Sequence, residues 1–110
     1  MTPQPSTPGR RLAPLMLALA AGLAAAAEPP PSELQVAVWA ASCMACHGTD
    51  GRAGSAGLAI AGQPQQALLT ALRQFRSGER PATVMHQHAK GYGDAELAAL
   101  ATYFARQPAR

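Results

Sequence analysis

Two cysteines and a histidine form the stretch of this sequence with the most specific chemistry. They occur as Cys43-Met44-Ala45-Cys46-His47, which is the spacing C-x-x-C-H. This spacing is typical of the covalent attachment of a c-type haem. The two thiols can add to the two vinyl groups of one haem, and the imidazole that follows directly can bind the iron as the proximal ligand. The motif therefore predicts one haem c, attached through Cys43 and Cys46 and ligated by His47.

The cysteine pair also has three alternative interpretations. A thioredoxin-like redox pair requires an alternating βαβ pattern, which this sequence does not show. A zinc site would need His86 and His88 as further ligands. Only one residue separates these two histidines, whereas zinc-binding pairs usually have wider spacing, and zinc gives no role to His47. A disulfide between two cysteines this close would form a small, strained loop. Haem attachment is preferred because it accounts for the whole motif.

The first 27 residues have the composition of a secretory signal peptide. They contain Arg10-Arg11, then a mainly apolar run over 12–24, then Ala25-Ala26-Ala27 as an A-x-A cleavage site. The apolar run is short and is interrupted by Pro14, so it is a poor membrane span; an uncleaved anchor is the alternative. We expect residues 1–27 to be cleaved after export by the general secretory route, which predicts a periplasmic domain over 28–110 without a membrane span.

Removing this segment changes the meaning of the composition. The whole sequence has nine basic and six acidic residues, and two of the basic ones belong to the predicted signal, which leaves a formal net charge of about +1. A chain so close to neutral gives no indication of nucleic-acid binding. About 83 residues would remain, near the size at which a protein core alone is sufficient, and they include few aromatic side chains. A haem would supply the missing apolar volume.

Hydrophobic periodicity predicts an all-α fold with three main helices and loops. The first helix runs from about Glu33 to the cysteines, with Ser32 as its N-cap. We expect its apolar face to consist of Leu34, Ala37, Val38 and Ala41. Trp39 lies four residues before Cys43, and we expect it to pack in the core.

The second predicted helix starts at Pro64 and ends at Gly78, and its buried stripe consists of Leu68, Leu69, Leu72 and Phe75. The last helix begins with Asp94 as N-cap, and its apolar face consists of Leu97, Leu100, Ala101 and Phe104. Two segments carry many helix breakers and are predicted to be loops: residues 48–62, in which Leu58 and Ile60 would line the haem, and residues 79–93.

The sixth coordination position of a His47-bound iron has Met85 as its leading candidate. A methionine thioether is a common axial ligand in electron-transfer haems. The other methionines are excluded by position, since two lie in the predicted signal and one lies between the cysteines: Met1, Met16 and Met44. His86 and His88 are the alternatives. An iron with two axial ligands from the protein has no open position for oxygen or peroxide, so we expect electron transfer rather than catalysis.

These features together resemble the short class I c-type cytochromes. The resemblance is carried by the stretches Cys43 to Gly51, Ala61-Gly62-Gln63 and Phe75 to Arg80, by Met85, and by the helix over 97–104. It implies a small monohaem fold with helices and loops wrapped around a covalently attached haem, and it implies Met85 as the distal ligand opposite His47. It also implies that the first helix packs against the last, with Trp39 meeting Leu100 and Tyr103.

Within this superfamily, a narrower resemblance is to the cytochrome subunit of flavocytochrome c sulfide dehydrogenase. It rests on Ser77-Gly78-Glu79, Val84-Met85 and Ala89-Lys90-Gly91-Tyr92. In that family a flavoprotein subunit oxidises sulfide and passes electrons to the haem subunit. The resemblance therefore implies a flavoprotein partner and a non-catalytic role in sulfide oxidation. A free periplasmic electron carrier is the main alternative, and a ligand-binding or sensing haem protein is a further one.

The chain departs from the family pattern at one position. The family usually has a proline shortly before the Ala-Gly-Gln sequence, and its backbone carbonyl accepts a hydrogen bond from the proximal histidine. Leu58 occupies that place here. Every residue has a backbone carbonyl, so the resemblance predicts that Leu58 accepts the bond from His47 instead.

Four basic residues fall in the stretch that should cover the distal side of the haem: Arg73, Arg76, Arg80 and Lys90. They have two interpretations, as a docking surface for a partner or as solvated side chains that neutralise the haem propionates. Because the predicted mature chain is nearly neutral, we expect little long-range electrostatic steering. Recognition of a redox partner would then depend on apolar contact around the haem edge, near Tyr92 and Met85.

Overall fold

A computed structural model of the chain describes residues 1–3, 27–55 and 57–109. Four α-helices follow one another: α1 (Glu33–His47), α2 (Gln65–Ser77), α3 (Met85–Lys90) and α4 (Asp94–Ala105). A single 3₁₀ turn, η1 (Thr49–Gly51), follows α1. These ranges contain no β-strand, so the all-α prediction is confirmed for them. The predicted signal peptide over 1–27 lies outside the described residues except at its ends.

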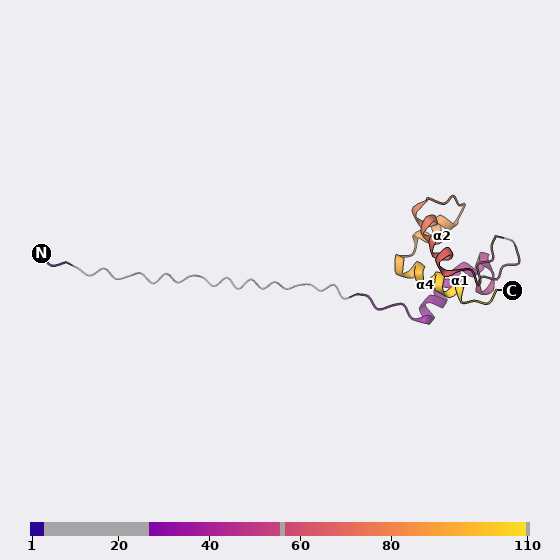
Figure 1. The fold of residues 1–110 in the computed structure, drawn as a ribbon, viewed down its shortest axis with the longest axis horizontal. Coiled ribbons are helices and arrows are strands. Elements are labelled where there is room, and N and C mark those ends of the chain that lie inside the picture. The colour runs from indigo at the N-terminus through magenta and orange to yellow at the C-terminus, as the bar shows by residue number, and fades with distance from the viewer. Residues whose placement is uncertain (4–26, 56, 110) are drawn as a thin grey trace.

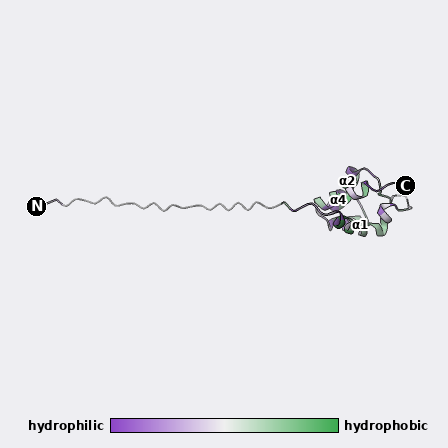
Figure 2. Cartoon of the chain, turned by 90° about the horizontal axis from the view of Figure 1, so that it is seen from below, coloured by the Kyte–Doolittle hydropathy of each residue, from purple (hydrophilic) through white to green (hydrophobic). Residues whose placement is uncertain are grey.

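The core lies where α1, α2 and α4 meet (Figure 1). α2 packs against both α3 and α4, and α1 packs against α4, as the resemblance implied. Hydrophobic residues occur in all three labelled helices (Figure 2). The seven residues of the core cluster are buried on the facing sides: Ala40, Leu68, Leu69, Leu97, Leu100, Ala101 and Phe104. The predicted apolar faces of α2 and α4 are therefore confirmed, with Leu72 and Phe75 only partly buried.

The predicted apolar face of α1 is wrong. Leu34 and Val38 are 75% and 60% exposed, and the residue of α1 that is fully buried is Ala40. The face that packs on the core also includes Trp39, Cys43 and Met44, which are partly buried. α1 is apolar on more than one side, so periodicity alone does not identify which side meets the core. Its predicted start is correct, because the Ser32 hydroxyl accepts a hydrogen bond from the Gln35 amide at 3.2 Å.

The start of α4 differs by one residue from the prediction. Gly93 is the N-cap and Asp94 is the first helical residue. The Glu96 carboxylate accepts a hydrogen bond from the Gly93 amide at 2.7 Å, which satisfies a donor at the helix start. Asp94 instead accepts a hydrogen bond from Arg76 of α2 at 2.5 Å. The side chain that the sequence suggests as a cap therefore connects two helices.

Part of the segment over 79–93, predicted to be irregular, is the short helix α3. Met85 is its first residue, so the side chain is placed by a helix and not by a loop. Ala89 of α3 is buried, and the helix packs on α2. A segment of six residues is too short for a helical period to be recognised in sequence, and such helices depend on tertiary contacts. No helix among the described residues has both the length and the apolar character needed to cross a membrane.

Candidate functional site

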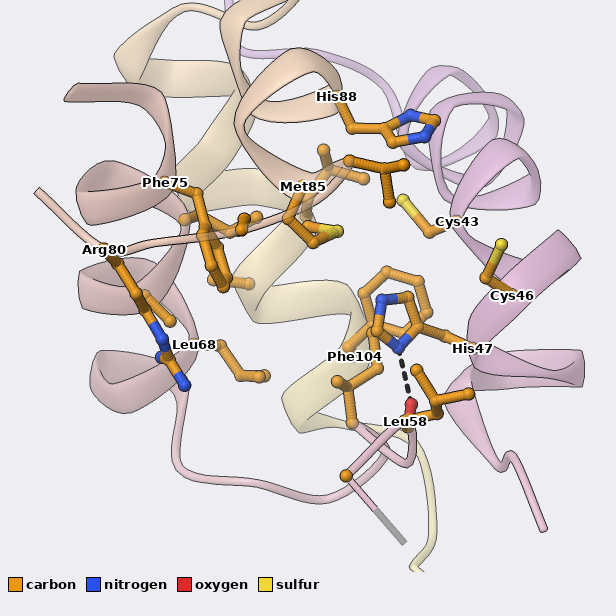
Figure 3. A pocket seen from close by; sticks show the side chains of 18 of the residues that line it. Cys43, Cys46, His47, Leu58, Leu68, Phe75, Arg80, Met85, His88 and Phe104 are labelled. Atoms are coloured by element: carbon orange, nitrogen blue, oxygen red, sulfur yellow. Dashed lines mark hydrogen bonds between the residues drawn. The ribbon is translucent and has the colours of Figure 1, made fainter. Parts of the chain in front are cut away.

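A cavity of about 410 Å³ lies between α1, α2, α3 and α4. Its apolar lining includes Leu68 and Phe75 of α2 and Leu100 and Phe104 of α4. Cys43, Cys46, His47 and Met85 all line the same cavity. Its volume lies within the range of about 300–1,000 Å³ that is typical of small-molecule and cofactor sites. Four residues predicted from the sequence to bind one group are thus brought together in one place (Figure 3).

The two cysteines lie three residues apart on α1, and their side chains enter the cavity from the same side (Figure 3). Both are free thiols: Cys43 is half-buried and Cys46 is exposed. Burial raises the pKa of the Cys43 thiol, and this effect exceeds the opposing effect of the hydrogen bond with Ser42. The disulfide alternative receives no support, since the pair is not bonded.

The remaining two alternatives for the cysteine pair are also not supported. The thioredoxin-like interpretation needs strands, and the described residues contain none. The zinc interpretation needs a cluster of ligands, and no group of three or more His, Cys, Asp or Glu side chains in the described part of the chain is arranged to hold a metal ion.

His47 is the last residue of α1, and its ring is held by the chain that follows it. The Nδ1–H group donates a hydrogen bond of 2.5 Å to the backbone carbonyl of Leu58. This is the contact that the resemblance predicted, made by leucine at the position where the family usually has proline. The other ring nitrogen faces the side of the cavity from which Met85 enters (Figure 3). The bond thus leaves Nε2 free to bind a metal ion within the cavity.

Met85 enters the cavity from the start of α3, with its thioether directed inward (Figure 3). His88, one turn later on α3, also lines the cavity, although its side chain is largely exposed. His86 is not among the lining residues, and its Nδ1 atom is buried without a hydrogen-bond partner in the described structure. Of the two histidines that were alternatives to Met85, His88 therefore lines the cavity and His86 does not.

The predicted basic docking residues have different environments. Arg76 is half-buried, and it donates hydrogen bonds to the Tyr92 carbonyl at 3.3 Å and to Asp94. Arg73 lies 3.9 Å from the same carboxylate. The guanidinium of Arg80 lies over the Phe75 ring, 4.8 Å from its centroid, and lines the cavity. The arginines are thus engaged with neighbouring groups of the protein, which favours a structural or cofactor-facing role for them.

Sequence reasoning missed the residues that hold the chain around His47. Tyr103 of α4 donates a hydrogen bond to Asp50 at 3.3 Å, and Asp50 also accepts one from Arg52 at 2.8 Å. Trp39 packs edge-on against Tyr92, with ring centroids 6.3 Å apart, while Tyr103 packs in the same way against Phe104. Asp50-Gly51 was recognisable as a turn, but nothing in the sequence connects it to a tyrosine 53 residues later.

The residues that line the cavity fit a haem. Its walls are largely apolar, as a macrocycle requires, while the thiols and one imidazole reach it from α1 and a thioether reaches it from α3. The Nδ1–H of His47 is already bound to a carbonyl, which is the outer-shell arrangement of a metal-ligating histidine.

Comparison with known proteins identifies the class. Residues 35–104 match the family model described as cytochrome C oxidase, cbb3-type, subunit III. Because this match covers more than half of the chain, the chain belongs to the cytochrome c family. The chain is therefore an electron-transfer protein with haem as its cofactor, rather than a catalytic enzyme.

Among individual proteins, the chain is 42% identical over 98 residues to the cytochrome subunit of sulfide dehydrogenase from Chlorobaculum tepidum, covering 84% of this chain and 89% of that protein. It is 44% identical over 69 residues to the thiosulfate dehydrogenase electron acceptor of Thiomonas intermedia, covering 61% of this chain but only 32% of that protein. It is also 35% identical over 74 residues to cytochrome c-554(548) of Halomonas halodenitrificans, covering 60% and 84%. The resemblance to sulfide dehydrogenase cytochrome subunits is thereby confirmed.

Proposed function

We propose that the chain is a periplasmic monohaem c-type cytochrome that serves as the haem subunit of a flavoprotein sulfide dehydrogenase. The observation that carries the proposal is the convergence of Cys43, Cys46, His47 and Met85 on one apolar cavity. Haem bound there supplies one-electron exchange between ferric and ferrous iron. The partner is inferred from the identity with the Chlorobaculum cytochrome subunit, which extends over most of both chains.

Each residue of the site has a separate role in this proposal. Cys43 and Cys46 line the cavity as free thiols and would hold the haem to α1 through thioether bonds to its two vinyl groups. His47 would hold the iron through Nε2, because its Nδ1–H is bound to Leu58. Met85 would supply a thioether ligand from α3. A thioether ligand raises the reduction potential relative to a second imidazole, which suits acceptance of electrons from a flavin.

The N-terminal sequence supports the periplasmic location, because its basic and apolar segments have the composition of a signal peptide. Export before haem attachment is consistent with a domain that begins after residue 27. The proline-rich stretch over 28–31 would then separate the cleavage site from α1.

The attachment of the haem tests the proposal most directly. We expect haem to stay with the polypeptide through acid–acetone extraction and a denaturing gel, because two thioether bonds survive both treatments. Cys46→Ser should retain at most one thioether and should shift the reduced absorption maximum. Ala45→Ser is a matched control that changes an exposed neighbouring residue of α1 outside the cavity lining and keeps both thiols. Haem that extracts completely from the wild-type protein would exclude covalent attachment.

A further inference from the structure

The chain segments on either side of His47 and Leu58 are both held by the end of α4. We call residues 48–52 the outgoing arm, since they leave α1 after His47, and residues 58–62 the returning arm, since they include Leu58. The outgoing arm contacts the Tyr103 side chain through Asp50. The returning arm contacts the next residue of the helix, because the Gly62 amide donates to the Phe104 carbonyl at 2.9 Å. Two successive residues of α4 therefore hold the two arms.

Asp50 is the anchor of the outgoing arm. Its backbone has φ +54°, in the left-handed region, which aspartate adopts more readily than most residues other than glycine. The two carboxylate oxygens have different donors, since Oδ1 accepts from the Tyr103 hydroxyl and Oδ2 accepts from Arg52. The Asp50 side chain is thus held by one residue of the arm and by one residue of α4.

Gly51 connects the outgoing arm to the returning arm through hydrogen bonds and close packing. Its carbonyl accepts hydrogen bonds from the amides of Ile60 at 2.8 Å and Ala61 at 3.1 Å. Gly51 is buried, with φ +80°, and a Cβ atom there would lie 2.8 Å from the Ile60 side chain and 2.9 Å from the Phe104 ring. The two arms are therefore packed too closely to move independently. Leu58 is two residues before Ile60, so its carbonyl moves with the returning arm.

We propose that Tyr103 and Asp50 are positioning residues for the proximal ligand. They fix the outgoing arm, the outgoing arm fixes the returning arm through Gly51, and the returning arm holds the Leu58 carbonyl against His47 Nδ1. The proposal deepens the proposed function, because it takes His47 as the iron ligand. A firmly held acceptor makes the imidazole a stronger donor to the metal, which stabilises ferric iron. Loosening the acceptor should therefore raise the reduction potential.

Tyr103→Phe removes only the hydroxyl and keeps the edge-on packing against Phe104. In the reduced holoprotein, followed by NMR, we expect the His47 Nδ1 proton to exchange with solvent about fivefold faster, since loss of one hydrogen bond changes a local equilibrium by roughly that factor. The reduction potential should rise in parallel. Thr102→Val is the matched control: the Thr102 hydroxyl donates to the Ala98 carbonyl within α4 and, among the described residues, makes no hydrogen bond to either arm. It should leave both measurements at their wild-type values.

Asp50 offers a second pair of variants. Asp50→Gly tolerates the positive φ and removes the carboxylate, so it should speed the exchange as Tyr103→Phe does. Asp50→Asn keeps an oxygen acceptor for Tyr103 and also tolerates this backbone region, so its exchange rate should stay near that of the wild type. Asp50 and Tyr103 act through one contact. The double variant Asp50→Gly/Tyr103→Phe should therefore have the same Nδ1 proton exchange rate as the more affected single variant.

Three results would overturn the proposal. The first is a double variant whose increase in exchange rate is the product of the two single increases, and the second is a wild-type exchange rate in Tyr103→Phe. The third is an increase in Thr102→Val as large as that in Tyr103→Phe. Failure of the proposed function is recognised separately. In that case the haem would be extractable, or the His47 resonances of the wild-type protein would lack the shifts of an iron ligand, before any variant is compared.

Discussion

The imidazole of His47 has its two nitrogens in different environments. Nδ1 is bound to the Leu58 carbonyl at the end of α1, while the other nitrogen faces the cavity that Met85 enters from α3. This asymmetry determines which nitrogen can bind a metal ion, because a histidine cannot offer Nδ1 to a metal while donating its proton to a carbonyl. At this scale the chemistry of the site depends on one backbone carbonyl as much as on the side chains.

Met85 provides the sharpest prediction at the residue scale. A thioether bound to ferric haem iron gives a weak near-infrared charge-transfer band, so we expect this band in the wild-type protein and its loss in Met85→Ala. Carbon monoxide should then bind the reduced variant readily, because the distal position is open. Met44→Leu is the matched control, since Met44 packs against the core from α1 and lies outside the group of residues that line the cavity.

The same spectra distinguish the rival ligand. If the wild-type band is absent and His88→Ala changes the ferric spectrum, the distal ligand is His88 and the assignment to Met85 is wrong. His88 is the histidine to replace because it lines the cavity and His86 does not.

At the scale of elements, an ion pair between Arg76 and Asp94 links the end of α2 to the start of α4, in addition to the apolar packing of the two helices. Arg76 binds both the Tyr92 carbonyl and the Asp94 carboxylate, so it joins α2 to the turn between α3 and α4. The hydrogen bond from Arg76, followed by its charge, lowers the pKa of Asp94 below its usual range. The contact is exposed to solvent, so we expect its contribution to stability to be small and sensitive to salt.

The sign of the pH dependence follows from the lowered pKa. A carboxylate whose pKa is depressed in the folded state contributes stability above its unfolded pKa, near 3.8, and this contribution disappears as pH falls through the folded pKa. In thermal melts from neutrality to about pH 2, Arg76→Gln should lower the melting temperature near neutrality and approach the wild type in acid. Arg73→Gln is the control, because Arg73 contributes least to the shift, and its effect should be smaller. A constant difference across the whole pH range would contradict this assignment.

At the scale of the molecule, the large apolar side chains that are exposed within residues 27–55 and 57–109 fall into two groups. Val84 and Leu58 are 52% and 42% exposed at the edge of the cavity, while Leu34 and Val38 lie on the outer side of α1. The arginines near the cavity are engaged with Asp94 or with Phe75. The exposed apolar side chains at the edge of the cavity therefore offer a partner apolar contact, beside the exposed Arg80 and His88.

This arrangement predicts how a flavoprotein sulfide dehydrogenase subunit would bind. We expect a 1:1 complex whose dissociation constant changes little between low and high salt, because screening acts mainly on exposed, separated charges. Val84→Gln should weaken the complex about tenfold, the effect of losing one central apolar contact. Leu34→Gln is the control, since Leu34 is equally apolar and more exposed but lies away from the cavity.

Calorimetric titrations at two ionic strengths measure both effects. A complex that dissociates at moderate salt would identify the arginines as the docking surface. If Leu34→Gln weakens binding and Val84→Gln does not, the outer side of α1 is the docking surface. A chain that never binds the flavoprotein would favour a free electron carrier.

Local patterns in the sequence were sufficient to identify the motif and the three longer helices, α1, α2 and α4. C-x-x-C-H lies within five consecutive residues, and α2 and α4 each have enough turns for their apolar stripes to be read, so Leu68, Leu69, Leu97 and Leu100 were correctly predicted to be buried. The family and the all-α class followed from the same short-range information. The axial role of Met85 and the thioethers stay predictions for the spectra described above.

Tertiary structure alone decided the features that depend on residues far apart in the chain. Which side of α1 meets the core, the helix at Met85–Lys90 and the pairing of Asp94 with Arg76 all arise from contacts with other elements. The separation of His88 from His86 depends on how α3 packs, and the bond from Tyr103 to Asp50 spans 53 residues. The physical reason is that an isolated segment determines its own period and caps, whereas the surface that it buries is determined by the segments that pack against it.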